Sequence, residues 1–173
     1  MRNTALLVMD MQRHYINAVT PIEYNDPPAW VHTINRAIEQ ANHHNIMVLY
    51  VVTPFEANLW NRNHMVATEG SVMLDYHVKI INDLVFTKKQ HSAFSSKRLV
   101  IHLREYHISH VILVGLLAET SITSTAHQAK KKGMYVTVIA DAIASASLEK
   151  KKNICHDFVK EGINVCTLHD IFI

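Results

Sequence analysis

The sequence contains few glycines and few cysteines, and each shortage removes a class of function. Its 173 residues include four glycines, and neither GxGxxG nor GxxxxGK[ST] occurs. We therefore expect no dinucleotide-binding or P-loop phosphate site. The two cysteines, Cys155 and Cys166, indicate that there is no disulfide framework and favour a reducing, cytoplasmic location.

The chain also lacks a long apolar segment and a concentrated charge of one sign. Its longest apolar runs, such as Val111–Ala118, are too short to span a bilayer, and the N-terminal segment is typical of a strand and not of a signal peptide. The net charge is +2, and the clusters Lys130–Lys132 and Lys150–Lys152 lie at or beside predicted helices without interleaved aromatic residues. We therefore expect neither a membrane nor a nucleic-acid partner.

Apolar strand-like runs alternate with helical patterns along the chain. The predicted strands are Ala5–Met9, Ile46–Val52, Leu84–Thr87, Val111–Val114, Tyr135–Ala140 and Asn164–Leu168. The predicted helices are Trp30–His44, Ser96–Tyr106, Glu119–Lys132 and Ser147–Glu161. Strands that are apolar on both faces and separated by helices predict a parallel sheet covered on both sides. The sequence thus predicts one domain, residues 1–173, with a three-layer α/β/α architecture and a mostly parallel, six-stranded Rossmann-like sheet.

Three polar residues follow predicted strands directly. Asp10 follows the first strand, Lys88 the third, and Ser121 lies in the first turn of the helix after the fourth. Ligands of parallel sheets bind beyond the carboxyl ends of the strands, and a helix N-terminus favours a developing anion. Ser121 would therefore suit a nucleophile beside an oxyanion hole. The structural alternatives are a helix cap at Ser121, a turn or helix cap at Asp10, and a solvated pair of Lys88 with Lys89.

Four segments resemble the motifs of the isochorismatase-like, or cysteine hydrolase, family. Val8–Gln12 resembles its hydrophobic-Asp-x-Gln motif, and Phe86–Phe94 its strand-ending Lys followed by an aromatic residue and Ser-Ala-Phe, with His91 where Tyr is common. Gly115–Ala126 resembles its Gly-x-x-Thr-x-x-Cys-Val-x-x-Thr-Ala motif, and residues 141–142 its Asp-Ala after the fifth strand. The four segments follow the family's order and spacing over nearly the whole chain.

The resemblance implies a hydrolase that acts on an amide bond of a small molecule. Asp10 would be the general base, Lys88 would orient and support it, and Ser121 stands where the family has its nucleophilic Cys. The resemblance also implies an oxyanion hole from the backbone N–H groups of Leu117 and Ser121, with a cis peptide bond between Leu116 and Leu117. It further implies a homodimer or larger homo-oligomer and no organic cofactor.

The serine at position 121 is the main departure from the family pattern. A cysteine thiol has a pKa near 8.5, whereas a serine hydroxyl is far less acidic and needs a strong base within hydrogen-bond reach. Amide hydrolysis with Ser121 should therefore be slow or absent. Three hypotheses remain open: an amidase in which Ser121 replaces the nucleophilic Cys, including an engineered replacement; a vinyl-ether hydrolase in which Asp10 donates a proton and water attacks; and a non-catalytic binding protein that keeps the pocket.

The substrate pocket and the metal content complete the expectations. The expected pocket residues are Gln12, Tyr15, Trp60, Phe94, Leu117 and Ala118. Four of them, Tyr15, Trp60, Phe94 and Leu117, predict an apolar lining that suits a small uncharged or aromatic amide. Ala118 stands where the family usually has Thr. Trp60 lies in the irregular stretch Thr53–Lys79, whose length is typical of lids and binding loops. We expect no metal, because the thirteen histidines show neither HExxH nor paired-ligand spacing with a third ligand.

Overall fold

Six strands form one sheet in the part of the chain that this computed structural model describes, residues 3–19, 28–54 and 74–172. The strands are β1 Thr4–Met9, β2 Met47–Val52, β3 Val85–Thr87, β4 His110–Gly115, β5 Tyr135–Ile143 and β6 Asn164–Cys166. Their order is β3-β2-β1-β4-β5-β6, and every neighbouring pair is parallel. The predicted six-stranded sheet is confirmed, and its strands are all parallel.

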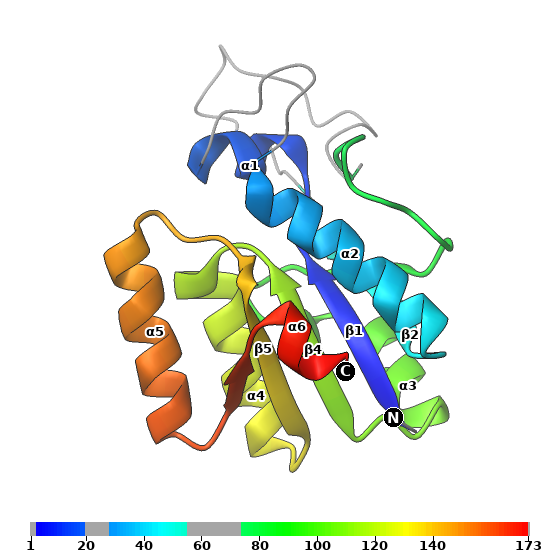
Figure 1. Cartoon of the computed structure of the whole chain (residues 1–173). Coiled ribbons are helices and arrows are strands. Elements are labelled where there is room, and N and C mark those ends of the chain that lie inside the picture. Colours follow the sequence, from blue (N-terminus) through cyan, green and yellow to red (C-terminus); the bar gives the residue numbers. More distant parts are fainter. Residues whose placement is uncertain (1–2, 20–27, 55–73, 173) are drawn as a thin grey trace, which may run out of the picture.

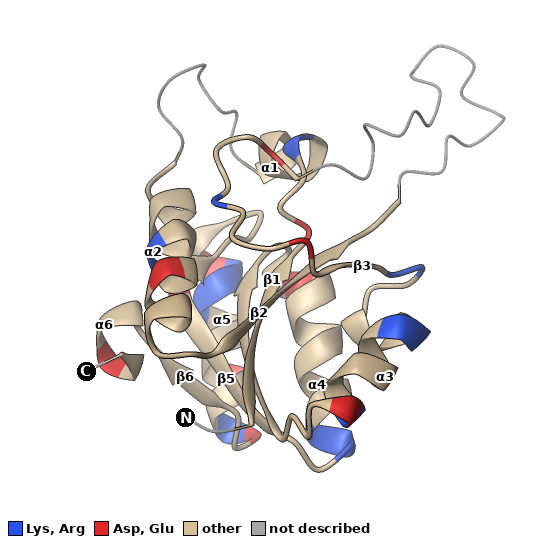
Figure 2. Cartoon of the chain, turned by 90° about the vertical axis from the view of Figure 1, so that its right-hand side faces the viewer, with Lys and Arg blue, Asp and Glu red and all other residues tan. Residues whose placement is uncertain are grey.

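Helices cover both faces of this sheet, as the doubly apolar strands require (Figures 1 and 2). The helical elements are α1 Arg13–Val19, α2 Ala29–His43, η2 Ala93–Ser95, α3 Lys97–Glu105, η3 Ala118–Ile122, α4 Thr123–Lys131, α5 Leu148–Lys160 and α6 Leu168–Ile171. Alternate residues of β1 enter two separate cores. Leu6 and Val8 pack with α1, α2 and α6, whereas Leu7 and Met9 pack with α3, α4 and α5. The predicted three-layer α/β/α architecture is therefore confirmed.

The structure differs from the prediction at α1 and at the end of β6. The short helix α1 was not expected, and Ile16 is its one fully buried residue. The predicted last strand is too long, because β6 ends at Cys166 and Leu168 begins α6. Thr167 caps that helix, since its side chain and backbone N–H both bind the carboxylate of Asp170.

The strand order changes direction between β1 and β4, and the two strand ends lie unusually close there. A Cβ atom on Gly115 would lie 2.1 Å from the carbonyl oxygen of Met9, and Gly115 has φ of +109°. Only glycine fits this contact and this backbone conformation. The close approach positions the chain after β4 beside Asp10, at the point where α/β sheets bind their ligands.

The described helices and the two cysteines relate to the expectations about a membrane segment and a disulfide framework. No described helix is long and apolar enough to cross a membrane. Cys155 and Cys166 are both half-buried free thiols, and burial raises the pKa of each.

Candidate active site

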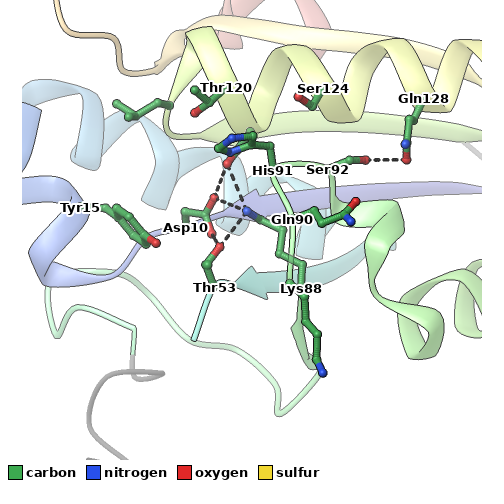
Figure 3. Close-up of a pocket in the computed structure, with 13 residues that line it drawn as sticks. Asp10, Tyr15, Thr53, Lys88, Gln90, His91, Ser92, Thr120, Ser124 and Gln128 are labelled. Atoms are coloured by element: carbon green, nitrogen blue, oxygen red, sulfur yellow. Dashed lines mark hydrogen bonds and ion pairs between the residues drawn. The ribbon is translucent and has the colours of Figure 1, made fainter. Parts of the chain in front are cut away.

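Asp10, Lys88 and Ser121 meet beyond the carboxyl ends of the strands and line a pocket of about 680 Å³. Figure 3 shows Asp10 and Lys88 pointing toward each other in this pocket. Hydrogen bonds that continue the sheet hold these two residues. The backbone N–H of Asp10 donates to Val51 at 2.8 Å, and that of Lys88 donates to Val52 at 2.9 Å. Asp10 has φ of +50°, a left-handed conformation that ends β1. The strand ends therefore bring together the three residues singled out in the sequence.

These three side chains form a closed hydrogen-bonded set. Ser121 Oγ donates to Asp10 Oδ2 at 2.6 Å, and Lys88 Nζ lies 2.9 Å from the same carboxylate oxygen. Lys88 Nζ also donates to Ser121 Oγ at 3.1 Å. All three residues are at most 5% exposed. Because a buried charge needs a partner, the charge of Asp10 and the charge of Lys88 are each stable here only while the other is present.

Thr53 completes this set and was missed as a functional residue in the sequence. Its Oγ1 donates to Asp10 Oδ1 at 2.8 Å and accepts from Lys88 Nζ at 2.7 Å. The Gln12 side chain holds the Thr53 backbone at both ends: its Oε1 accepts from the Thr53 N–H and its Nε2 donates to the Thr53 carbonyl, each at 2.9 Å. The available signal was the position of Thr53 directly after β2, the same criterion that selected Asp10 and Lys88.

Ser121 lies in a π-helical turn, η3, which precedes α4. The Ile122 N–H donates to the Leu117 carbonyl at 3.1 Å. The peptide bond between Leu116 and Leu117 is cis, as the family resemblance implied. Leu117 and Ser121, whose backbone N–H groups are the predicted oxyanion hole, both line the pocket.

The loop after β5 anchors this turn from the outside. The Ala118 N–H donates to the Ala144 carbonyl at 2.8 Å. Glu119 Oε1 accepts from Ser145 Oγ at 3.1 Å and from the Ala146 N–H at 2.9 Å. These bonds fix the turn that carries Ser121 against a neighbouring strand end.

The expected pocket residues divide between the pocket and the core. Tyr15 lines the pocket, and burial together with the charge of Asp10 raises its pKa, so its hydroxyl stays protonated. Gln12 and Ala118 are fully buried and are not among the described lining residues, because Gln12 holds Thr53 and Ala118 belongs to the core.

Phe94 also lies outside the described lining, because its ring packs against the core that includes α3 and α4, with Lys132 Nζ 5.7 Å from the ring centroid. Trp60 falls outside the residues that the structure describes.

The described lining contains more residues with polar side chains than the sequence indicated. Besides the residues already placed, the described lining contains Lys89, Gln90, His91, Ser92, Thr120, Ser124 and Gln128. These polar residues come from the loop after β3, from η3 and from α4. Within the described ranges, no group of three or more His, Cys, Asp or Glu side chains has the arrangement of a metal site.

A protein-family model matches almost the whole chain. The model for the isochorismatase domain matches residues 4–170. The chain belongs to the isochorismatase family. The relationship predicted from the sequence motifs is therefore confirmed. The isochorismatase family is a family of hydrolases.

Individual members of the isochorismatase family differ in what their names say. The chain is 27% identical over 185 residues to the "Probable inactive nicotinamidase" of Arabidopsis thaliana, covering 98% of this chain and 94% of that protein. It is 28% identical over 161 residues to the isochorismatase of Bacillus subtilis, covering 84% of this chain and 49% of that protein. The chain thus spans about half the length of the Bacillus relative.

Solved structures of the isochorismatase family superpose over almost the whole chain. The N-carbamoylsarcosine amidase of Thermoplasma acidophilum has a TM-score of 0.73 and 26% identity, with 96% of each chain covered. An isochorismatase family protein of Desulfovibrio vulgaris has a TM-score of 0.82 and 20% identity, covering 98% of this chain and 96% of its own. The second likeness shows the shared fold.

Proposed function

We propose that this member of the isochorismatase family hydrolyses a carbon–nitrogen amide bond of a small molecule, with Ser121 as its weak nucleophile. The observation that carries the proposal is the position of Ser121 Oγ, which lies 2.6 Å from Asp10 Oδ2 and 3.1 Å from Lys88 Nζ. A nucleophile needs a base within hydrogen-bond distance, and Asp10 meets this requirement. The likeness to an N-carbamoylsarcosine amidase supports an amide as the reacting group.

The geometry supports an acyl-transfer sequence with balanced proton movements. Asp10 Oδ2 accepts the hydroxyl proton as Ser121 Oγ attacks the amide carbonyl carbon. The backbone N–H groups of Leu117 and Ser121 would stabilise the oxyanion. The proton on Asp10 then passes to the leaving amine, the C–N bond breaks, and an ester remains on Ser121. Water, deprotonated by Asp10, hydrolyses that ester and restores the serine.

The rate of this sequence should be low. A serine hydroxyl gives up its proton far less readily than the cysteine thiol of the family motif, so the attack step carries a higher barrier. Each 1.4 kcal/mol added to a barrier slows a reaction about tenfold. The name of the Arabidopsis relative, which calls it inactive, is compatible with a low rate.

The test compares the wild-type chain with Ser121→Cys and Ser121→Ala. Each form is incubated with a panel of small primary amides, and ammonia release and intact protein mass are measured. We expect Ser121→Cys to release ammonia and to accumulate a thioester adduct, the wild type to be slow, and Ser121→Ala to be inactive.

Three other outcomes would replace the proposal. Equal ammonia release by all three forms would favour direct attack of water on the amide. Turnover of a small vinyl ether by all three forms, with no ammonia from the amides, would favour the vinyl-ether hydrolase reaction with Asp10 as the acid. No turnover by any form, with ligand binding retained, would favour a binding protein.

We also propose that the chain is cytoplasmic, as its two cysteines favour, and that it forms a homodimer or larger homo-oligomer, as the family resemblance implies. Light scattering during size-exclusion chromatography tests the second point, and a monomer at micromolar concentration would contradict it.

A further inference from the structure

The helix that carries Ser121 is rich in hydroxyl groups. Five of the six positions from 120 to 125 are hydroxyl residues, namely Thr120, Ser121, Thr123, Ser124 and Thr125. Three of these groups have partners inside the protein: Ser121 binds Asp10, Thr123 Oγ1 donates to the Ala118 carbonyl at 2.6 Å, and Thr125 Oγ1 accepts from the Ala93 N–H at 3.0 Å. Capping, packing and the catalytic set therefore account for only three of the five.

The other two hydroxyl groups face the pocket. Thr120 and Ser124 line it together with Gln128, and the three follow one another at one-turn intervals along the helix (Figure 3). Neither the Thr120 nor the Ser124 hydroxyl has a hydrogen-bond partner within the described ranges of the chain. We call Thr120, Ser124 and Gln128 the donor row.

The hydrogen bonds of Ser92 fix which end of Gln128 is available. Ser92 Oγ accepts from the Phe94 N–H at 3.2 Å and donates its own proton to Gln128 Oε1 at 2.8 Å. The amide oxygen of Gln128 is therefore occupied, and its NH₂ group is the end that remains for a ligand. An NH₂ group only donates hydrogen bonds.

The charges around the pocket point to an anionic ligand group. Asp10 is the one carboxylate in the described lining, and Lys88 neutralises it at 2.9 Å. Apart from Tyr15, whose hydroxyl stays protonated, the remaining described lining residues with ionisable side chains are Lys89 and His91, both of which are basic residues. A carboxylate accepts hydrogen bonds only, so it matches a surface of donors and positive charge.

We propose that the substrate is a small amide that carries a carboxylate at its other end. Its amide lies at Ser121, and its carboxylate binds the Ser124 and Gln128 end of the donor row together with Lys89 and His91. The proposal rests on the amide hydrolysis proposed above and adds the class of substrate. Ser121 and Gln128 are separated by roughly 10 Å along the helix at 1.5 Å per residue, so a short flexible chain between the two groups spans the pocket.

The test uses pairs of compounds that differ only in charge at the far end. Glutaramate and glutaramide share the reacting amide, and succinamate and adipamate vary the chain length. In the Ser121→Cys background, kcat/KM should be at least about tenfold higher for glutaramate than for glutaramide, which corresponds to one charge-assisted hydrogen bond.

Variants then locate the group that recognises the carboxylate. Adding Lys89→Gln and His91→Gln removes the positive charge, and adding Ser124→Ala removes one donor, so each should reduce the preference for glutaramate. Lys131→Gln removes a charge from the same helix outside the described lining and should leave the preference unchanged. Circular dichroism checks that every variant is folded.

Two results would overturn the proposal: glutaramide cleaved as well as glutaramate, or a preference that survives both changes. If Ser121→Cys cleaves no amide, the proposed hydrolysis fails, and calorimetric binding to the wild-type chain decides the substrate class separately. Tighter binding of glutaramate than of glutaramide, lost with Lys89→Gln/His91→Gln, supports the carboxylate site. Equal or absent binding overturns it.

Discussion

Replacing Lys88 by methionine should destabilise the protein strongly and in a way that Asp10 controls. Lys88 is 2% exposed, and its Nζ contacts Asp10 Oδ2, Thr53 Oγ1 and Ser121 Oγ at 2.9, 2.7 and 3.1 Å. Methionine fills most of the volume of the lysine stem but supplies no charge. The Asp10 carboxylate, itself 3% exposed, then remains buried without a cation.

The size of the effect follows from the burial of both charges. Breaking a buried ion pair by removing one partner costs about 3–5 kcal/mol, whereas replacing both partners is often nearly neutral. Asp10 keeps its bonds from Thr53 and Ser121 and borders the pocket, so we expect the lower end, about 3 kcal/mol. For a chain of this size that loss lowers Tm by about 6–12 °C.

The assay is urea unfolding of four forms: wild type, Lys88→Met, Asp10→Asn and the double variant. Asparagine is chosen at position 10 because Asp10 has φ of +50°, a conformation that asparagine also adopts readily. The double variant should be more stable than Lys88→Met, with a coupling energy of about 2 kcal/mol or more. If Lys88→Met loses less than about 1 kcal/mol of stability, or the effects of the two changes simply add, the buried ion pair does not hold the site together.

Three further predictions concern residues around the site and at the base of the sheet. Thr53→Val keeps the shape but removes the hydroxyl between Asp10 and Lys88, so it should cost about 2 kcal/mol in urea unfolding, and a neutral result would contradict its linking role. Gly115→Ala should lower the free energy of unfolding by at least about 3 kcal/mol or prevent folding, because its Cβ would lie 2.1 Å from the Met9 carbonyl oxygen. Gly133→Ala is the control: this residue has open space around it and φ of +77°, so the loss should be only about 1–2 kcal/mol. Burial lowers the pKa of His110, so the stabilisation from its neutral ring is complete above about pH 6.5 and is lost as the pH falls below that value. His110→Gln should therefore flatten the decline in unfolding free energy between about pH 7 and 5. An unchanged slope would refute this prediction.

The sheet was predictable because its pattern does not depend on tertiary contacts. A strand such as β2 is apolar on both faces in the sequence, and its last five residues are buried in the structure. The helix α1 gave no such signal, because it has seven residues and buries only Ile16 completely. A single apolar anchor produces no periodicity. The end of β6 was predicted too late in the sequence, because the cap at Thr167 begins the helix α6 where the strand was expected to continue.

The candidate site was predictable in its residues but not in its contacts. Asp10, Lys88 and Ser121 each follow a strand, and a parallel sheet gathers such residues at one edge. The role of Thr53 depends on register, because Met9 pairs with Val51 and this pairing sets Thr53 beside Asp10. Phe94 was assigned to the pocket from its place in a motif, but the short helix η2 directs it to the core.

The hydrogen bonds of Ser121 connect the stability of the site with its low expected rate. The hydroxyl donates to Asp10 at 2.6 Å and accepts from Lys88 at 3.1 Å, so its oxygen satisfies two buried charged groups at once. A thiol is a weaker donor and a weaker acceptor, and would satisfy them less well. The bond to Asp10 favours attack because it removes the proton. The bond from Lys88 opposes attack because it occupies a lone pair that the nucleophile needs. The contacts that make an oxygen stable at this position therefore also hold it back from reaction.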